Sequence, residues 1–104
     1  MKREYCEAVH LEAQGAFTLR ELEQLTGLAE AMLRELVDYG ALEPRDVRAS
    51  DWTFDAHVLM LARTAGRLQR TFELDAAGLA LVLRMHEQLR TMEAEMRRLR
   101  ARVR

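Results

Sequence analysis

The stretch TLRELEQLTGLAEAMLRELVDYG, residues 18–40, decides the fold of this chain. It predicts two short helices joined by a tight turn. Thr18 is a favourable N-cap residue, and Glu21 three positions later completes a capping-box sequence. Gly27 supplies the backbone freedom that a sharp turn requires, and Gly40 stands where a C-cap glycine is expected. Helices this short must pack on each other and on the chain that follows, so the stretch predicts a helix-turn-helix unit.

Each of these helices carries one apolar stripe at helical spacing. The first stripe comprises Leu19, Leu22 and Leu25, and the second comprises Leu33, Leu36 and Val37. We expect both stripes to face a shared core.

The chain has 104 residues and only one proline, so its composition favours a mostly helical protein. Because 49% of the residues are hydrophobic and 32% are charged, we expect it to form a core and remain soluble. No apolar run reaches the roughly 18 residues of a membrane span. The first 15 residues contain glutamates and no apolar block, so we expect no signal peptide. A single cysteine, Cys6, excludes an internal disulfide and suggests a reducing cytoplasm.

Charge divides the chain into two unlike parts. Residues 1–56 hold six Lys/Arg and twelve Asp/Glu, a net −6, whereas residues 57–104 hold ten arginines and five acids, a net +5. The helix-turn-helix lies in the acidic part. That is the wrong sign for a protein that reads DNA.

The first segment, residues 4–14, predicts a short edge strand or an irregular lead-in. Cys6 and His10 are four residues apart, which would suit a metal pair on a helix, but a metal site needs three or four ligands. His57 and His86 lie in other segments. We therefore expect an incidental thiol and imidazole, with no metal and no cofactor.

A small hairpin, or wing, is predicted after the second helix. Pro44 ends the helical stretch, and residues 45–54 are too short and polar for another helix. Trp52 and Phe54 would share one side of a strand. We expect this aromatic pair to belong to the core; the alternative is a stacking platform for nucleic-acid bases.

Two longer helices follow, with Asp55 and Asp75 as their N-caps. The apolar face of the first comprises Val58, Leu61, Ala62, Ala65, Leu68 and Phe72. The second can run from Ala76 nearly to the chain end. We predict a domain of residues 1–74, comprising the helix-turn-helix, wing and third helix, and a coiled-coil helix of residues 75–104.

The last helix has the heptad spacing of a coiled coil over three repeats. Its seam comprises Val82, Met85, Leu89, Met92, Met96, Leu99 and Val103. So small a domain cannot cover seven apolar residues, so we predict a homodimer; the alternative is packing back onto the same chain. The end of this helix is rich in arginine, which complements the helix dipole or, alternatively, binds a nucleic acid or an acidic partner.

No catalytic motif is visible. The chain has no glycine-rich phosphate loop, and its one serine, Ser50, lacks a neighbouring His-Asp arrangement. The carboxylates are scattered over predicted exposed faces. We expect a binding module and not an enzyme.

The order of these elements resembles the MerR superfamily, and within it the CbpM-like chaperone modulator group. The likeness covers roughly residues 16–103. It is carried by Leu22 and the turn Leu25-Thr26-Gly27-Leu28, the exit Val37-Asp38-Tyr39-Gly40-Ala41-Leu42-Glu43-Pro44-Arg45, the element Trp52-Thr53-Phe54-Asp55, Arg67-Leu68, Glu73-Leu74-Asp75 and the C-terminal end rich in Leu, Met and Arg. It implies a MerR-like winged helix-turn-helix followed by a long C-terminal dimerisation helix.

The resemblance also implies a function. Proteins of that group are dimers that bind the J-domain of a CbpA-type, DnaJ-like co-chaperone and inhibit both its co-chaperone activity and its DNA binding. J-domains typically display a basic helix face, which the acidic second helix of this chain would complement. We expect the contact to involve Glu23, Glu30, Arg34, Glu35 and Asp38; the alternative is that they form only a solvated face.

Two other functions remain open. A dimeric MerR-type transcription regulator would bind operator DNA through Arg34, Arg45, Arg48 and the wing. A coiled-coil adaptor would bind an unrelated partner.

Overall fold

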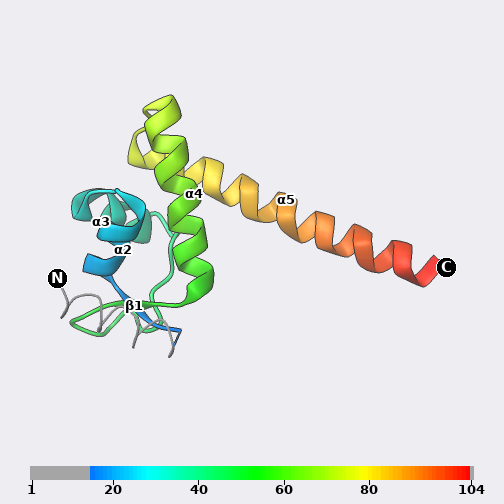
Figure 1. Ribbon diagram of the computed structural model, residues 1–104, viewed down its shortest axis with the longest axis horizontal. Coiled ribbons are helices and arrows are strands. Elements are labelled where there is room, and N and C mark those ends of the chain that lie inside the picture. The colour runs from blue at the N-terminus through cyan, green and yellow to red at the C-terminus, as the bar shows by residue number, and fades with distance from the viewer. Residues whose placement is uncertain (1–14, 104) are drawn as a thin grey trace.

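The computed structural model describes residues 15–103, which are mostly helical as predicted (Figure 1). The elements are β1 (Phe17–Thr18), α2 (Leu19–Thr26), α3 (Glu30–Asp38), β2 (Thr53–Phe54), α4 (Ala56–Phe72) and α5 (Ala76–Val103). The helix-turn-helix and the long terminal helix are both confirmed. The lead-in of residues 4–14, with Cys6 and His10, lies outside the described residues.

The first helix starts with the predicted capping box. The Glu21 backbone N–H donates to the Thr18 hydroxyl at 3.1 Å, and the Thr18 backbone N–H donates to the Glu21 carboxylate at 3.2 Å. Gly27 ends α2 with φ of 77°, a left-handed conformation that an L side chain disfavours. Gly40 takes the same conformation (φ 78°) directly after α3. Both turn glycines are therefore required by the backbone path.

Among residues 15–103, the core is built from the apolar sides of α2, α3, α4 and α5, with additions from β1, β2 and the segment after α3. Its most deeply buried side chains are Leu22, Leu33, Leu36, Leu42, Phe54, Leu79 and Leu83. One stripe residue was predicted wrongly, because Leu25 is 42% exposed. Thr26 takes the buried place one turn after Leu22, and its hydroxyl donates to the Leu22 carbonyl at 2.6 Å. The core side of α2 therefore runs through positions 22 and 26.

A second stripe residue was also predicted wrongly. Phe72 is 63% exposed because it is the last residue of α4, at the turn into α5. Val58, Leu61, Ala62 and Ala65 are buried as predicted, and Leu68 is half-buried. The apolar face of α4 thus extends one turn beyond the core that it covers.

The wing is not a self-contained hairpin. β2 pairs antiparallel with β1, with Phe17 opposite Phe54 and Thr18 opposite Thr53. Residues 45–53, which we call the wing loop, are closed by a backbone hydrogen bond from the Arg45 N–H to the Thr53 carbonyl at 2.8 Å. The pairing joins the residues before α2 to the residues before α4, and so ties the wing to the start of the helix-turn-helix.

The long helices begin at the predicted caps. The Asp55 carboxylate accepts from the Val58 N–H at 2.9 Å, and the Asp75 carboxylate accepts from the Gly78 N–H at 2.8 Å. The first turns of α5 pack in the core, and the rest of its 28 residues project away from the body (Figure 1). The division at residue 75 stays a prediction. No helix among residues 15–103 is long and apolar enough to cross a membrane.

Candidate partner-binding surface

One side of α3 is buried and the other presents charged groups to solvent. Leu33 and Leu36 are completely buried, while the charged residues on the other side of the helix are exposed. These exposed residues include Glu30, Arg34, Glu35 and Asp38. The structure therefore brings four of the five sequence-predicted contact residues onto one accessible helix, which carries three acids and one arginine.

The arginine of this face is partly neutralised by a neighbour. Arg34 Nη2 lies 3.5 Å from Glu30 Oε1, and both side chains are more than half exposed (56% and 57%). A surface pair of this kind contributes about 0.3–0.5 kcal/mol to a helix. The pair also affects the charge of the face. Because Arg34 offsets the charge of Glu30, the remaining carboxylates of Glu35 and Asp38 make the face negative overall.

The fifth predicted contact residue, Glu23, lies on α2 and touches the start of α3. Its carboxylate Oε2 accepts a hydrogen bond from the Glu30 backbone N–H at 2.8 Å. The N-cap residue Ala29 makes no side-chain cap. Glu23 therefore places its negative charge at the N-terminus of α3 and has a structural task besides any contact with a partner.

The wing loop lies beside this helix and adds an aromatic wall. Trp52 packs partly buried against the core, and the Arg34 guanidinium carbon stands 5.5 Å from its ring centroid, in cation–π range. Phe54 is completely buried, and its ring centroid lies 6.4 Å from that of Trp52 in an edge-to-face arrangement. The core prediction thus holds fully for Phe54 and only in part for Trp52.

A hollow of about 550 Å³ opens between α2, α3 and the wing loop. Its walls include Leu19 and Arg20 from α2, Glu30 and Arg34 from α3, and Val47 and Trp52 from the wing loop. This hollow was not predicted from the sequence. The available signal was Val47, an aliphatic residue five positions before the only tryptophan of the chain, in a loop that is mostly polar.

Arg34, Arg45 and Arg48 are the arginines that the alternative function, operator binding, would use. Arg45 donates through Nη2 to the Gly15 carbonyl at 2.8 Å. Arg48 is exposed on the wing loop, and its backbone N–H donates to the Asp46 carboxylate at 3.0 Å. The side chains of Arg34 and Arg45 are therefore engaged by groups of the same chain: Arg34 by Glu30 and Trp52, and Arg45 by the Gly15 carbonyl.

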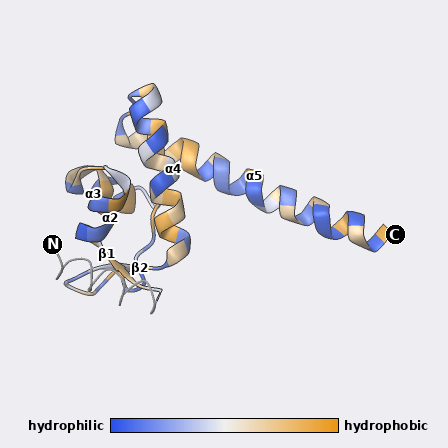
Figure 2. Cartoon of the chain, in the orientation of Figure 1, coloured by the Kyte–Doolittle hydropathy of each residue, from blue (hydrophilic) through white to orange (hydrophobic). Residues whose placement is uncertain are grey.

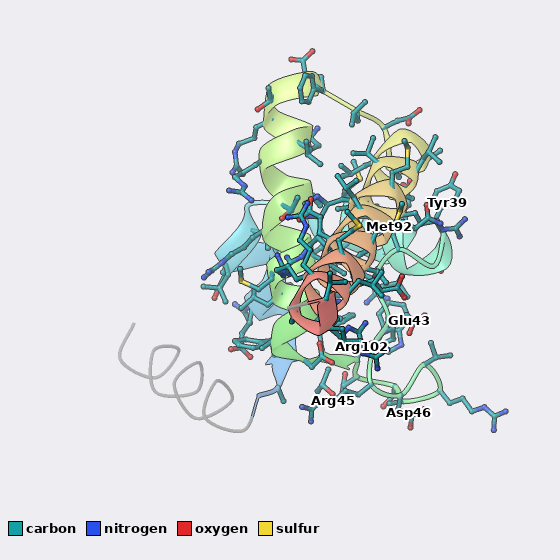
Figure 3. All side chains as sticks on the ribbon, turned by 90° about the vertical axis from the view of Figure 1, so that its right-hand side faces the viewer. Tyr39, Glu43, Arg45, Asp46, Met92 and Arg102 are labelled. Atoms are coloured by element: carbon teal, nitrogen blue, oxygen red, sulfur yellow. The ribbon has the colours of Figure 1, made fainter. Side chains whose placement is uncertain are left out.

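A second hollow, of about 500 Å³, lies between the exit of α3, the start of α4 and α5. Figure 3 looks along α5, with Tyr39 and Glu43 to one side of it and Arg45 and Asp46 below. Arg84 donates to the Tyr39 carbonyl at 3.0 Å, and His57 Nε2 lies 3.1 Å from Glu87 Oε2. Both contacts lie where α5 leaves the body, just beyond its buried residues Leu79 and Leu83.

Beyond residue 83, α5 buries none of its described residues. Val82 is half-buried, and the other members of the predicted seam are at least half exposed: Met85, Leu89, Met92, Met96, Leu99 and Val103. In Figure 2 the projecting helix is mostly hydrophilic, with apolar positions recurring along it. Within residues 15–103, no other segment covers the seam, so α5 does not pack back onto the described part of its own chain.

The described residues, 15–103, contain no group of three His, Cys, Asp or Glu side chains that could hold a metal ion. What the surface offers is an acidic helix face, a neighbouring aromatic hollow and an exposed apolar seam. These are features of a binding protein.

The helix-turn-helix, the paired wing and the projecting helix define a MerR-type regulatory protein. The family model described as "MerR HTH family regulatory protein" matches residues 17–101. Chaperone modulatory protein CbpM of Escherichia coli (strain K12 / DH10B) is 34% identical over 87 residues, which cover 84% of this chain and 86% of that protein. CbpM of Shigella boydii serotype 18 matches to the same extent. The chain belongs to the MerR helix-turn-helix family and, within it, to the CbpM chaperone modulatory proteins.

Proposed function

We propose that this chain is a non-enzymatic chaperone modulator that binds the J-domain of a CbpA/DnaJ-like co-chaperone in the cytoplasm. By occupying the J-domain it inhibits the co-chaperone activity and the DNA binding of that partner. Its relatives are named chaperone modulatory proteins, which supports the general role. The acidic exposed face of α3 is the observation that supports the choice of partner.

The charge of α3 favours a basic protein over a nucleic acid. Glu30, Glu35 and Asp38 are exposed there, and Glu23 adds a further carboxylate at the start of the helix. Each carboxylate near a phosphate repels it, and no counterion release compensates. A basic helix would instead be attracted, which raises the association rate and selects among partners.

Self-association through α5 is part of the proposal. The exposed seam from Met85 to Val103 has the heptad spacing of a coiled coil and is not covered by the described chain. A second copy of α5 would remove these side chains from water. The working unit is then a homodimer that carries two α3 faces.

Calorimetric titration of the purified protein with a DnaJ-like J-domain tests the proposal. We expect saturable binding with a stoichiometry near one J-domain per protomer, weakening as salt is added. A titration without heat at high concentration, together with salt-sensitive retention of duplex operator fragments, would contradict the proposal. That result would favour a MerR-type transcription regulator instead.

A further inference from the structure

The side of α5 that lies opposite to its apolar seam is basic. By the 3.6-residue helical period, this side, which we call the outer face, consists beyond residue 89 of Arg90, Thr91, Ala94, Arg97, Arg98 and Ala101. The two carboxylates of the same stretch, Glu93 and Glu95, lie beside the seam instead. The outer face therefore carries three positive charges and no negative charge.

The three arginines of the outer face are not used inside the chain. All three are exposed, and within residues 15–103 their guanidinium groups have neither an ion pair nor a hydrogen bond. Arg45, Arg70 and Arg84, by contrast, each donate to a backbone carbonyl of the body. The charges of the outer face thus remain available to another molecule.

The acidic body does not cancel this charge. Leu83 is the last buried residue of α5, and a rise of about 1.5 Å per residue places the outer face roughly 10–27 Å beyond it. At physiological salt the screening length is about 8 Å, so the arginines determine the local field. The helix also projects away from the body (Figure 1). A partner therefore meets a positive surface although the chain has a net charge of −1.

The composition of the outer face favours a phosphate backbone among anionic partners. Protein interfaces have an apolar centre, and membrane-binding helices insert large apolar side chains beside their basic ones. The outer face offers neither, since its only apolar side chains are alanines. Its guanidinium groups can each bind a phosphate through two N–H groups. A DNA duplex is stiff and stays straight over the roughly 16 Å that the face spans.

We infer that the outer face of α5 binds the phosphate backbone of duplex DNA without reading its sequence. The guanidinium groups neutralise phosphates, which gives affinity but carries no sequence information. The contact lies opposite to the seam, so it stays accessible when a second copy covers the seam. It is also separate from the acidic face of α3. The inference therefore goes beyond the proposed function and does not depend on it.

Fluorescence anisotropy of a short labelled DNA duplex, measured with the full chain from low to high salt, tests the inference. Arg90→Gln with Arg97→Gln removes two charges from one row of the face and preserves helix propensity. We expect this variant to bind about tenfold more weakly at low salt and to lower the slope of log affinity against log salt by about two. Arg90→Lys with Arg97→Lys keeps both charges and should retain most of the affinity. A duplex of scrambled sequence should bind the unsubstituted chain equally well.

The matched control lies on α4. Arg63→Gln with Arg67→Gln changes the net charge equally at two exposed arginines of the body, and it should bind the duplex nearly as the unsubstituted chain does. Circular dichroism and sedimentation velocity verify that all variants keep the fold and the oligomeric state. J-domain titration tests the proposed function separately, and its result leaves the inference about DNA unchanged.

Four results would overturn the inference. The first is no binding of the duplex by the unsubstituted chain at low salt, and the second is an equal loss in the α4 control. The third is a loss caused by Arg34→Gln with Arg48→Gln but not by substitution of the outer face, which would assign the DNA to the helix-turn-helix and wing. The fourth is stronger binding of phosphatidylserine vesicles or of poly-glutamate than of the duplex, which would assign the face to a membrane or to an acidic protein.

Discussion

The carboxylate of Glu23, on α2, caps the backbone N–H of Glu30 at the start of α3, with 2.8 Å between oxygen and nitrogen. The two residues are seven apart in sequence and lie on either side of the turn at Gly27. A helix N-terminus carries free N–H groups and a partial positive charge, both of which a carboxylate satisfies. Here the cap comes from the preceding helix, so the turn geometry and the start of α3 depend on each other.

Removing this cap should destabilise the protein without touching its core. Glu23→Ala is expected to lower the free energy of unfolding by about 1 kcal/mol, the usual cost of losing an N-cap. Glu23→Gln keeps an oxygen acceptor and should lose less. Urea unfolding followed by circular dichroism measures both, and equal stability of Glu23→Ala and the unsubstituted chain would contradict the capping role.

Gly66 is expected to tolerate no side chain. A Cβ at this position of α4 would lie 2.5 Å from the Thr26 carbonyl oxygen, a backbone atom of α2 that Arg70 also contacts at 3.0 Å. Gly66→Ala should therefore force α2 and α4 apart and cost about 1–3 kcal/mol, as overpacking does. Thermal unfolding measures the loss.

Gly78→Ala is the matched control for that substitution. Its Cβ would lie 3.1 Å from the Asp75 carboxylate oxygen that accepts from the Gly78 N–H, so this side chain need move only by a few tenths of an ångström, whereas at Gly66 a backbone atom would have to move. Alanine is also the better helix former by about 1 kcal/mol. A Gly66→Ala variant as stable as Gly78→Ala would show that the two helices are not in close contact.

The two aromatic residues at the wing should differ in their contribution to stability. Phe54 is completely buried, and Phe54→Ala is expected to cost about 3–5 kcal/mol. Trp52 is half-buried, so Trp52→Ala should cost less, about 2 kcal/mol, since less apolar surface returns to water. Denaturant titration measures the free energy of unfolding of both variants. A larger decrease for Trp52→Ala than for Phe54→Ala would contradict the burial of the two side chains in this structure.

Charge reversal on α3 should reduce J-domain affinity. Replacing Glu30 and Asp38 together by lysine is expected to weaken binding by more than tenfold at low salt, with a smaller effect at high salt. Calorimetry with the J-domain measures the change. The double variant Glu73→Lys with Glu95→Lys alters the net charge equally, away from α3, and should retain most of the affinity. Unchanged affinity after reversal of Glu30 and Asp38 would remove α3 from the contact.

A charge in the seam of α5 should separate the protomers. Leu89 is 57% exposed in the single chain, and Leu89→Asp would place a carboxylate between two helices. We expect a monomer at micromolar concentration by sedimentation velocity, and a dimer for the control Met60→Asp, whose residue lies on α4. A Leu89→Asp variant that remains dimeric would contradict the coiled-coil prediction.

Local sequence was enough to predict the helices and their ends. The Thr18–Glu21 capping box, the turn at Gly27 and the caps Asp55 and Asp75 act within three or four residues, so their sequence signals are complete. The buried leucines of α3 followed from the 3.6-residue period for the same reason. The acidic sign of the exposed α3 face also follows from composition and periodicity alone.

Only the tertiary structure decided which remote groups meet. Strand β2 pairs with β1, about 36 residues earlier in the chain by their register, so no local pattern in the wing could predict it. The exposure of Leu25 and Phe72 depends on where neighbouring helices end, and the hollow at Trp52 depends on three elements converging. Sequence periodicity fixes which side of a helix is apolar, whereas packing between distant segments determines how much of that side is covered and which polar groups stand beside it.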